Sequence, residues 1–213
     1  MAAKRVLVIA AVVLIVVPSI AGAQSWVVRA RGISIDPDAS SSTIGDTGTS
    51  VDVDSATTLE VDITRKFNHM FGLELIAATA RHDIDAVGGA LAGASAGSVK
   101  VLPPTLTFQW FILGEGLFSP YVGAGINYTK FYDYSLSDDL AGAGVTDIDF
   151  DDSFGFAGNI GLDINLGNFI INGDIKYIQI DTDATLMTAS GVLDTISVDV
   201  NPWVFGVGVG YRF

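Results

Sequence analysis

Three side chains in one short stretch, His82, Asp83 and Asp85, are the best candidates for chemistry in this sequence. A histidine beside an acid is the pair that hydrolytic enzymes use as general base and orienting group. An active site also needs a nucleophile within reach of the base, but the nearby Ser95 and Ser98 lie in a stretch rich in Gly and Ala. We therefore favour a hydrogen bond that pins a loop over catalysis. The chain is not predicted to be an enzyme or to hold a cofactor.

A second group of candidates is acidic and lies in the middle of the chain. Divalent cations prefer oxygen ligands of this kind, but the spacing lacks the glycine and the terminal glutamate of a calcium-binding loop. We interpret the group as the solvated face of a loop, with divalent-cation bridging to lipopolysaccharide as the alternative. Its members are Asp138, Asp139, Asp147, Asp149, Asp151 and Asp152.

The stretch that best indicates the fold is residues 202–213, PWVFGVGVGYRF. At a period of two, its aromatic and aliphatic side chains fall on one face, whereas Gly and one Arg fall on the other. Strict alternation predicts a β-strand. An apolar face with aromatic residues at both ends is typical of a strand that meets lipid. Because closure into a barrel removes exposed strand edges, this stretch predicts a transmembrane β-barrel.

The first residues predict an exported protein. Two basic residues precede an apolar run at 6–17, and an Ala-Gly-Ala sequence follows at 21–23. This arrangement predicts a signal peptide at residues 1–23 and a barrel domain at residues 24–213. The apolar run is shorter than the roughly 20 residues that a spanning helix needs.

The composition fits such a barrel and excludes other classes of function. The 213 residues are 49% hydrophobic with a mean hydropathy of +0.46, yet the chain has no other apolar run long enough to span a bilayer as a helix. Alternating lipid-facing strands produce this combination. The net charge of −13 disfavours nucleic acid as a partner, and the absence of Cys excludes disulfides and thiol chemistry.

Alternation divides the mature chain into eight strands, whose connections are long and short in turn. Outer-membrane barrels have an even number of strands, long extracellular loops and short periplasmic turns. We therefore predict an all-β fold, an eight-stranded antiparallel up-and-down transmembrane β-barrel in a Gram-negative outer membrane. The predicted strands are 25–35, 57–67, 70–81, 99–111, 120–132, 153–166, 169–180 and 202–213. The predicted long loops are 36–56, 82–98, 133–152 and 181–194.

The inward faces of these strands carry charges of both signs. Buried charges must pair, so we expect a salt-bridged network, and an eight-stranded barrel is narrow enough for side chains to fill it. This argues against a general aqueous porin. The inward charges are Arg29, Arg31, Glu60, Asp62, Glu74, Asp163, Asp174, Lys176 and Arg212. The predicted aromatic girdles contain Trp110, Trp203, Tyr121, Tyr128, Tyr177 and Tyr211.

Several blocks of this sequence resemble the OmpW family of outer-membrane proteins. The resemblance spans most of the barrel, although Ala80-Arg81 departs from the bulkier apolar residue expected before the basic one. It implies an eight-stranded barrel with a narrow apolar interior path, in a family thought to pass small hydrophobic molecules. The blocks are 26–32, 82–84, 102–107, 120–129 and 202–213.

A ligand path is predicted where inward positions are apolar. Proline has no N–H and cannot donate to a strand ladder, so we expect a weak or open wall beside Pro103 and Pro104. The alternative is that the two prolines only start the strand or mark a bulge. Leu102 joins the path if the prolines shift the face of the strand. The predicted path consists of Ile76, Ala78, Leu102, Pro103, Pro104, Ile178 and Ile180.

Three functions are compatible with these patterns. The favoured one is an outer-membrane channel that passes small hydrophobic molecules, with lateral exit through the barrel wall. The alternative is a structural or surface-interaction barrel, an adhesin or antigen, with a sealed interior. A lipid enzyme with its site at the rim is the least favoured. The predicted partners are outer-membrane lipid, lipopolysaccharide, a small hydrophobic ligand and the outer-membrane assembly machinery, which would bind the C-terminal strand.

Overall fold

The structure of the protein is a computed structural model that describes residues 25–44, 48–89 and 92–213. The predicted signal peptide, residues 1–23, lies outside the described residues, and its cleavage stays a prediction. Within the described ranges, no helix is both long and apolar enough to cross a membrane.

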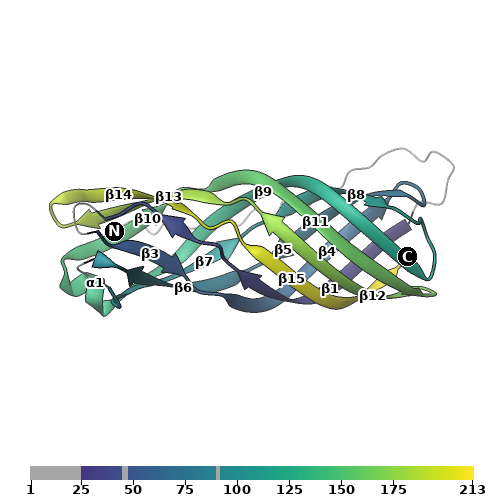
Figure 1. The fold of residues 1–213 in the computed structure, drawn as a ribbon, viewed down its shortest axis with the longest axis horizontal. Coiled ribbons are helices and arrows are strands. Elements are labelled where there is room, and N and C mark those ends of the chain that lie inside the picture. Colours follow the sequence, from purple (N-terminus) through teal and green to yellow (C-terminus); the bar gives the residue numbers. More distant parts are fainter. Residues whose placement is uncertain (1–24, 45–47, 90–91) are drawn as a thin grey trace, which may run out of the picture.

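In the part of the chain that the structure describes, antiparallel strands are accompanied by one short helix (Figure 1). The elements are β1 (Ser25–Asp36), β2 (Ser40–Ser41), β3 (Ser50–Val53), β4 (Ala56–Lys66), β5 (Phe71–Ala78), β6 (Ala80–Val87), β7 (Ser95–Leu102), β8 (Thr105–Phe111), β9 (Phe118–Leu136), α1 (Asp138–Gly142), β10 (Val145–Phe150), β11 (Ser153–Leu166), β12 (Phe169–Ile178), β13 (Asp181–Thr188), β14 (Gly191–Asp199) and β15 (Trp203–Arg212).

Eight of these strands close into a barrel in the order β1, β4, β5, β8, β9, β11, β12 and β15. The closing strand β15 pairs with β1, from Val27 opposite Arg212 to Asp36 opposite Trp203. Every neighbouring pair is antiparallel. The predicted all-β, eight-stranded, antiparallel barrel is therefore confirmed.

The small inner face of β15 follows from what lies against it. A Cβ atom added at Gly208 would be 2.8 Å from Arg31 Cγ, and one added at Gly210 would be 2.7 Å from Arg29 Cγ. Real Cβ atoms do not approach other carbons this closely. Glycine on β15 therefore makes the space through which the two arginine side chains of β1 reach the barrel interior.

The barrel strands continue beyond the membrane, and the prediction of long loops was wrong for much of 82–98, 133–152 and 181–194. β9 has 19 residues, about 65 Å of strand, whereas the apolar core of a bilayer is about 30 Å thick. The stretches 82–98 and 181–194 contribute to the β6–β7 and β13–β14 hairpins, and β3 and β10 pair with them. Their Gly, Ser and Asp content is typical of loops. Their residues also alternate, however, as buried His82 and Ile84 do with exposed Asp83 on β6.

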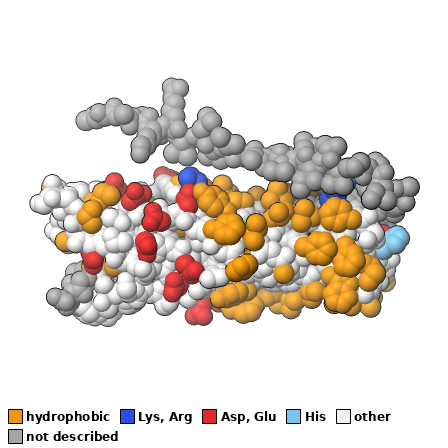
Figure 2. All heavy atoms as spheres, turned by 90° about the horizontal axis from the view of Figure 1, so that it is seen from above, with side chains coloured by type: hydrophobic (Ala, Val, Ile, Leu, Met, Phe, Trp, Pro, Cys, Tyr) orange, Lys and Arg blue, Asp and Glu red, His pale blue; other side chains and the backbone are white. Residues whose placement is uncertain are grey.

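The outer surface divides into two zones along the length of the molecule. Figure 2 shows hydrophobic side chains gathered over one half and acidic side chains over the other. The hydrophobic half includes exposed Leu59, Phe156 and Val207, at 75%, 72% and 72%. Exposed apolar side chains at this density would be unfavourable in water and are favourable against lipid. The acidic half, which includes α1, is the end that lies outside the bilayer (Figure 1).

One member of the predicted aromatic girdles was misplaced. Trp110, Trp203, Tyr128, Tyr177 and Tyr211 are all exposed on the outer face, whereas Tyr121 is 1% exposed and lies inside the barrel. Its position on β9 has the same parity as the inward Asn127 and Thr129. The alternation along β9 therefore indicated the inward orientation of Tyr121, whereas its aromatic residue type suggested the outer face.

Phe213 is expected to matter for assembly of the barrel. Its backbone N–H donates to Trp26 O (2.9 Å) and its ring stacks edge-on against Tyr211. We expect Phe213→Asp to lower the amount of heat-modifiable barrel in outer-membrane fractions, because it places a charge on the lipid face beside the seam with β1. The control is Leu193→Asp, which introduces the same charge at an exposed position on the extracellular β14 and should leave barrel levels unchanged. Wild-type levels of Phe213→Asp would contradict the role assigned to this seam.

Candidate functional site

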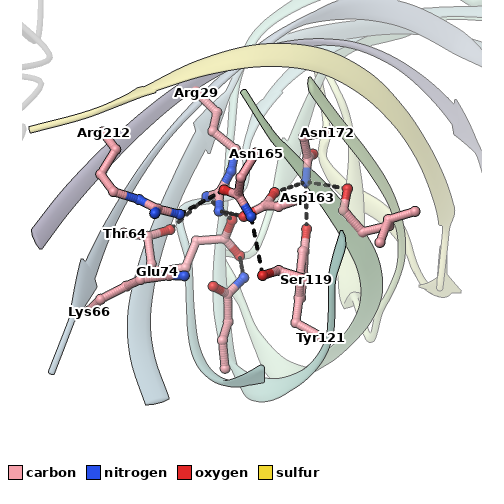
Figure 3. Close-up of polar contacts among 12 residues, drawn as sticks. Arg29, Thr64, Lys66, Glu74, Ser119, Tyr121, Asp163, Asn165, Asn172 and Arg212 are labelled. Carbon is pink, nitrogen blue, oxygen red and sulfur yellow. Dashed lines mark hydrogen bonds and ion pairs between the residues drawn. The ribbon is translucent and has the colours of Figure 1, made fainter. Parts of the chain in front are cut away.

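The periplasmic half of the barrel interior is filled by an ion-pair network. Arg29 lies at its centre, with NH1 2.8 Å from Asp62 Oδ1 and NH2 2.7 Å from Asp163 Oδ2. Arg29 NH1 also donates to Thr64 Oγ1 at 2.8 Å. All of these residues are buried, and they come from β1, β4 and β11. Figure 3 shows Arg29, Thr64 and Asp163 pointing toward one another inside the barrel.

Arg31 lies two residues further along β1 and shares Asp62 and Glu74 with Arg29. Its Nε is 2.7 Å from Glu60, and its NH2 is 2.8 Å from Asp62 and 3.0 Å from Glu74. Asp174 is 3.8 Å from its NH1. Arg31 and these carboxylates are all buried, so the carboxylates have lost contact with water and face the fixed guanidinium instead. Such an exchange is tolerated only when charges are paired and hydrogen-bonded.

Neutral polar side chains complete the network. Glu74 Oε2 accepts from Thr107 (3.1 Å) and from Gln109 (2.7 Å). The misplaced Tyr121 has a role here, since its hydroxyl donates to Asp174 at 2.9 Å. Tyr121 therefore joins β9 to β12 across the interior. The prediction missed these neutral partners because it considered only charged residues.

The predicted salt-bridged network is therefore present. The predicted inward charges are buried in it, except that half-buried Arg212 binds Asn165 (2.7 Å) at the periplasmic mouth. The prediction missed Lys66, which is fully buried, 3.5 Å from Glu115 and 3.7 Å from the centre of the Phe111 ring. Its parity on β4, shared with Asp62, is the signal that would have placed it inside.

Above this network the interior becomes an apolar cavity with a volume of about 90 Å³. Its floor is formed by the Glu60–Lys176 ion pair (2.9 Å), with Thr105 and Thr129 beside it. Aliphatic side chains of β1, β3, β6, β7, β13, β14 and β15 form the walls. The cavity therefore occupies the extracellular half of the molecule and ends on the polar network.

The structure brings five of the seven predicted path residues to the cavity. Ile76, Ala78, Pro103, Ile178 and Ile180 line it. Leu102 and Pro104 are half-buried and are not among the lining residues, so the inward shift considered for Leu102 is wrong. Its neighbour Val101 takes the inward position instead. Other lining residues were missed. Ile84, Ala184 and Leu186 lie in stretches predicted as loops, Ile196 and Val198 lie between the last predicted loop and the last predicted strand, and Val99 begins a predicted strand whose first residues were not assigned a face.

The wall of the barrel is interrupted on one side of the two prolines. Ladder pairing stops at Ile76 with Thr105 and resumes at Ala80 with Val101, and among these described residues the three intervening pairs are absent. Because the flanking pairs are four residues apart on both strands, the register is kept and the interruption is not a bulge. On the other side Pro104 O still accepts from Tyr128 N at 3.1 Å.

Side chains cross the outer surface beside this interruption. Thr79, between β5 and β6, hydrogen-bonds through its hydroxyl to Tyr132 OH at 2.6 Å. The Asp133 carboxylate is 2.6 Å from Lys100 Nζ and 3.3 Å from Arg81 NH2. The Lys100 ammonium holds the pKa of Asp133 below its ordinary value. These exposed contacts join β6, β7 and β9 above the opening.

The fold does not assemble a site from either group first considered for chemistry, the one at 82–85 or the acidic one at 138–152. On β6, His82 faces the cavity whereas Asp83 is exposed on the outside, so they do not form a histidine–acid pair. The predicted hydrogen bond of His82 exists but goes to the backbone carbonyl of Asp54. Across residues 25–44, 48–89 and 92–213, no three acidic or His side chains are placed to hold a metal ion.

Comparison with known proteins agrees with this architecture. The model of the OmpW family matches residues 22–213. Outer membrane protein W of Vibrio cholerae serotype O1 is 37% identical over 193 residues, covering 88% of each chain. The crystal structure of OprG from Pseudomonas aeruginosa superposes with a TM-score of 0.83 at 36% identity, covering 90% of this chain and 97% of that one. The solid-state NMR structure of AlkL gives 0.69 at 20% identity, covering 92% and 93%, and shares the fold.

These relatives and the lipid-facing band place the protein in the bacterial outer membrane, embedded in lipid and lipopolysaccharide. The family match covers the whole described barrel, including the strands that carry the polar network and the cavity. The chain therefore belongs to the OmpW family of outer-membrane β-barrel proteins.

Proposed function

We propose that the protein is a channel for small hydrophobic molecules, which enter the apolar cavity from outside and leave sideways into the bilayer beside Pro103 and Pro104. The observation that carries the proposal is a cavity whose walls are apolar and whose floor is a buried ion-pair network. The free energy of an apolar molecule falls when it leaves water and contacts these apolar walls. Contact with the charged floor, formed by Glu60 and Lys176, offers the molecule no such stabilisation.

The polar network makes the periplasmic half an unfavourable route. Passage would separate Arg29 and Arg31 from carboxylates whose side chains are fully buried. Breaking a single buried ion pair costs about 3–5 kcal/mol, and here several would break together. The route supported by these contacts therefore turns away from the axis above Glu60 and Lys176.

The interrupted wall offers a lateral exit at that level. Pro103 lines the cavity. The residues opposite the two prolines, which have no ladder partner on that side, are the small residues Ala77, Ala78 and Thr79. Separating the two strands there breaks no ladder hydrogen bond, because among the described pairs those between Ile76–Thr105 and Ala80–Val101 are already missing. An opening at this point would lead into the lipid zone of the outer surface.

The alternative function, a structural or surface-interaction barrel with a sealed interior, gives the apolar cavity no role. A sealed barrel would be more stable with its extracellular half packed by side chains, because empty apolar space forfeits contacts. The two functions differ in one measurable property. Only the channel raises the rate at which an apolar compound crosses the outer membrane.

The proposal is tested by uptake of a labelled alkane, such as octane, in cells with and without the protein. We expect faster uptake in cells with the wild-type protein than in cells without it. The Ala86→Trp variant should lower uptake toward the rate of cells that lack the protein. Ala86 is 3% exposed and lines the cavity, so an indole there fills it. The matched control is Ala30→Trp, which places the same ring on the outer face of β1. Equal rates with and without the wild-type protein, at verified barrel levels, would contradict the channel.

A further inference from the structure

One polar side chain in the apolar walls of the cavity has no function in the channel described so far. His82 on β6 is 5% exposed and lines the cavity. The other ionisable lining residues have partners, since Glu60 and Lys176 pair at the floor (2.9 Å) and Tyr134 donates to Ala96 O (2.6 Å). His82 therefore stands out as a polar group within an apolar wall.

The hydrogen bond of His82 determines which ring nitrogen carries the proton. Its Nδ1 is 2.8 Å from the backbone carbonyl oxygen of Asp54. A carbonyl oxygen only accepts, so Nδ1 must be the donor. Burial keeps the pKa of His82 below its ordinary value, which favours the neutral ring. A neutral imidazole with its proton on Nδ1 has an unprotonated Nε2, and that atom is a hydrogen-bond acceptor.

The acceptor Nε2 is unused in the described part of the chain. The structure gives His82 one hydrogen bond, through Nδ1, and among the described residues no hydrogen bond to its Nε2 is present. An acceptor on the wall of an apolar cavity meets no donor there, whereas an apolar ring of the same size would pack in the wall without losing a hydrogen bond. The wall therefore carries a polar group suited to something that enters the cavity.

We propose that His82 is a specificity-determining residue of the cavity, and that the preferred ligand is an apolar molecule with a hydroxyl group that donates to His82 Nε2. This rests on the proposed function. The ligand class is an aliphatic alcohol or a phenol: an apolar body that fits the aliphatic walls and one O–H donor. Aldehydes and ethers carry only acceptors and meet another acceptor at this position.

The first test observes the ring itself. The chain contains two histidines, and His69 lies exposed on a periplasmic turn, so ¹⁵N-imidazole spectra of the barrel in lipid nanodiscs contain an internal control. Adding 1-octanol should shift the Nε2 signal of His82 and leave His69 unchanged. Adding octanal should shift neither. An equal response of His82 to both compounds, or none to octanol, would overturn the proposal.

The second test measures selectivity by calorimetry, with empty nanodiscs subtracted. In the wild-type protein 1-octanol should bind about fivefold more tightly than octanal, as expected for one neutral hydrogen bond. His82→Phe keeps the ring and removes the acceptor, and it should bring the ratio to about one. A distortion caused by losing the Asp54 contact would weaken both compounds alike and leave the ratio intact, which would overturn the proposal.

The two proposals fail in different experiments. If cells take up octane through the protein but the His82 signal does not respond to octanol, the specificity proposal is wrong and the channel stands. If octanol shifts the His82 signal while uptake is the same with and without the protein, the cavity binds hydroxyl compounds and the channel is wrong.

Discussion

Replacing Pro103 and Pro104 together with valine is expected to lower uptake of octane about fivefold at matched barrel levels. Valine has the N–H that proline lacks, and the register already sets residues 103 and 104 opposite Ala78 and Ala77. Because Pro104 O points toward Tyr128, the backbone N–H at position 104 also faces β9, and only the N–H at position 103 faces Ala78. One restored ladder hydrogen bond would raise the free energy of opening the wall by about 1 kcal/mol, or roughly fivefold in rate. Uptake into whole cells is the measurement.

The control for this substitution is Pro120→Val. Pro120 lies in β9, opposite Leu162 at the periplasmic end, and it does not line the cavity. Its replacement changes the same chemical group far from the interrupted wall and should leave uptake unchanged. Unchanged uptake by the Pro103, Pro104 variant would exclude the lateral route while leaving other routes through the cavity open. The cavity-filling variant Ala86→Trp then decides whether the compound passes through the cavity at all.

Arg31→Met is expected to destabilise the folded barrel by about 3–5 kcal/mol, the range measured when one partner of a buried ion pair is removed. Arg31 is within 3.0 Å of Glu60, Asp62 and Glu74, so its loss leaves three neighbouring carboxylates facing one another without their shared cation. Methionine keeps an unbranched apolar side chain and removes the charged, hydrogen-bonding guanidinium. Equilibrium unfolding by urea in lipid vesicles is the measurement.

The matched control for this effect is Arg81→Met. Arg81 pairs with Asp133 at 3.3 Å, but their side chains are 42% and 52% exposed. Exposed ion pairs contribute at most about 1 kcal/mol. A similar loss of stability in the two variants would show that the interior network is hydrated and does not act as a seal, which would also remove the main argument against passage along the barrel axis.

The sequence by itself determined which side chains face inward. The spacing of Arg29, Glu60, Asp174 and Lys176 placed them inside correctly, because alternation depends only on local strand geometry. The same rule placed Phe205 and Val207 on lipid. The same rule places Tyr121 and Lys66 inside the barrel. Tyr121 was assigned to an aromatic girdle because of its residue type, and Lys66 was overlooked.

The sequence did not show how far the strands continue. The Asp, Gly and Ser content of 133–152 and 181–194 predicted loops, but β9, β10, β13 and β14 run through these stretches. Small and polar residues are tolerated in strands when both edges are paired, and pairing is set by neighbours distant in sequence. The extracellular part of the cavity therefore could not be found without the fold.

The features that carry the functional argument were decided by tertiary structure. Pro103 and Pro104 predicted a lost hydrogen bond, but only the register showed that it is lost toward Ala77–Thr79 and kept toward Tyr128. His82 was visible in the sequence, but its free acceptor depends on a bond to Asp54, 28 residues away. Alternation fixes a side chain's face through the geometry of one strand, whereas a partner depends on which strands lie together and in which register, and only the closed barrel determines that.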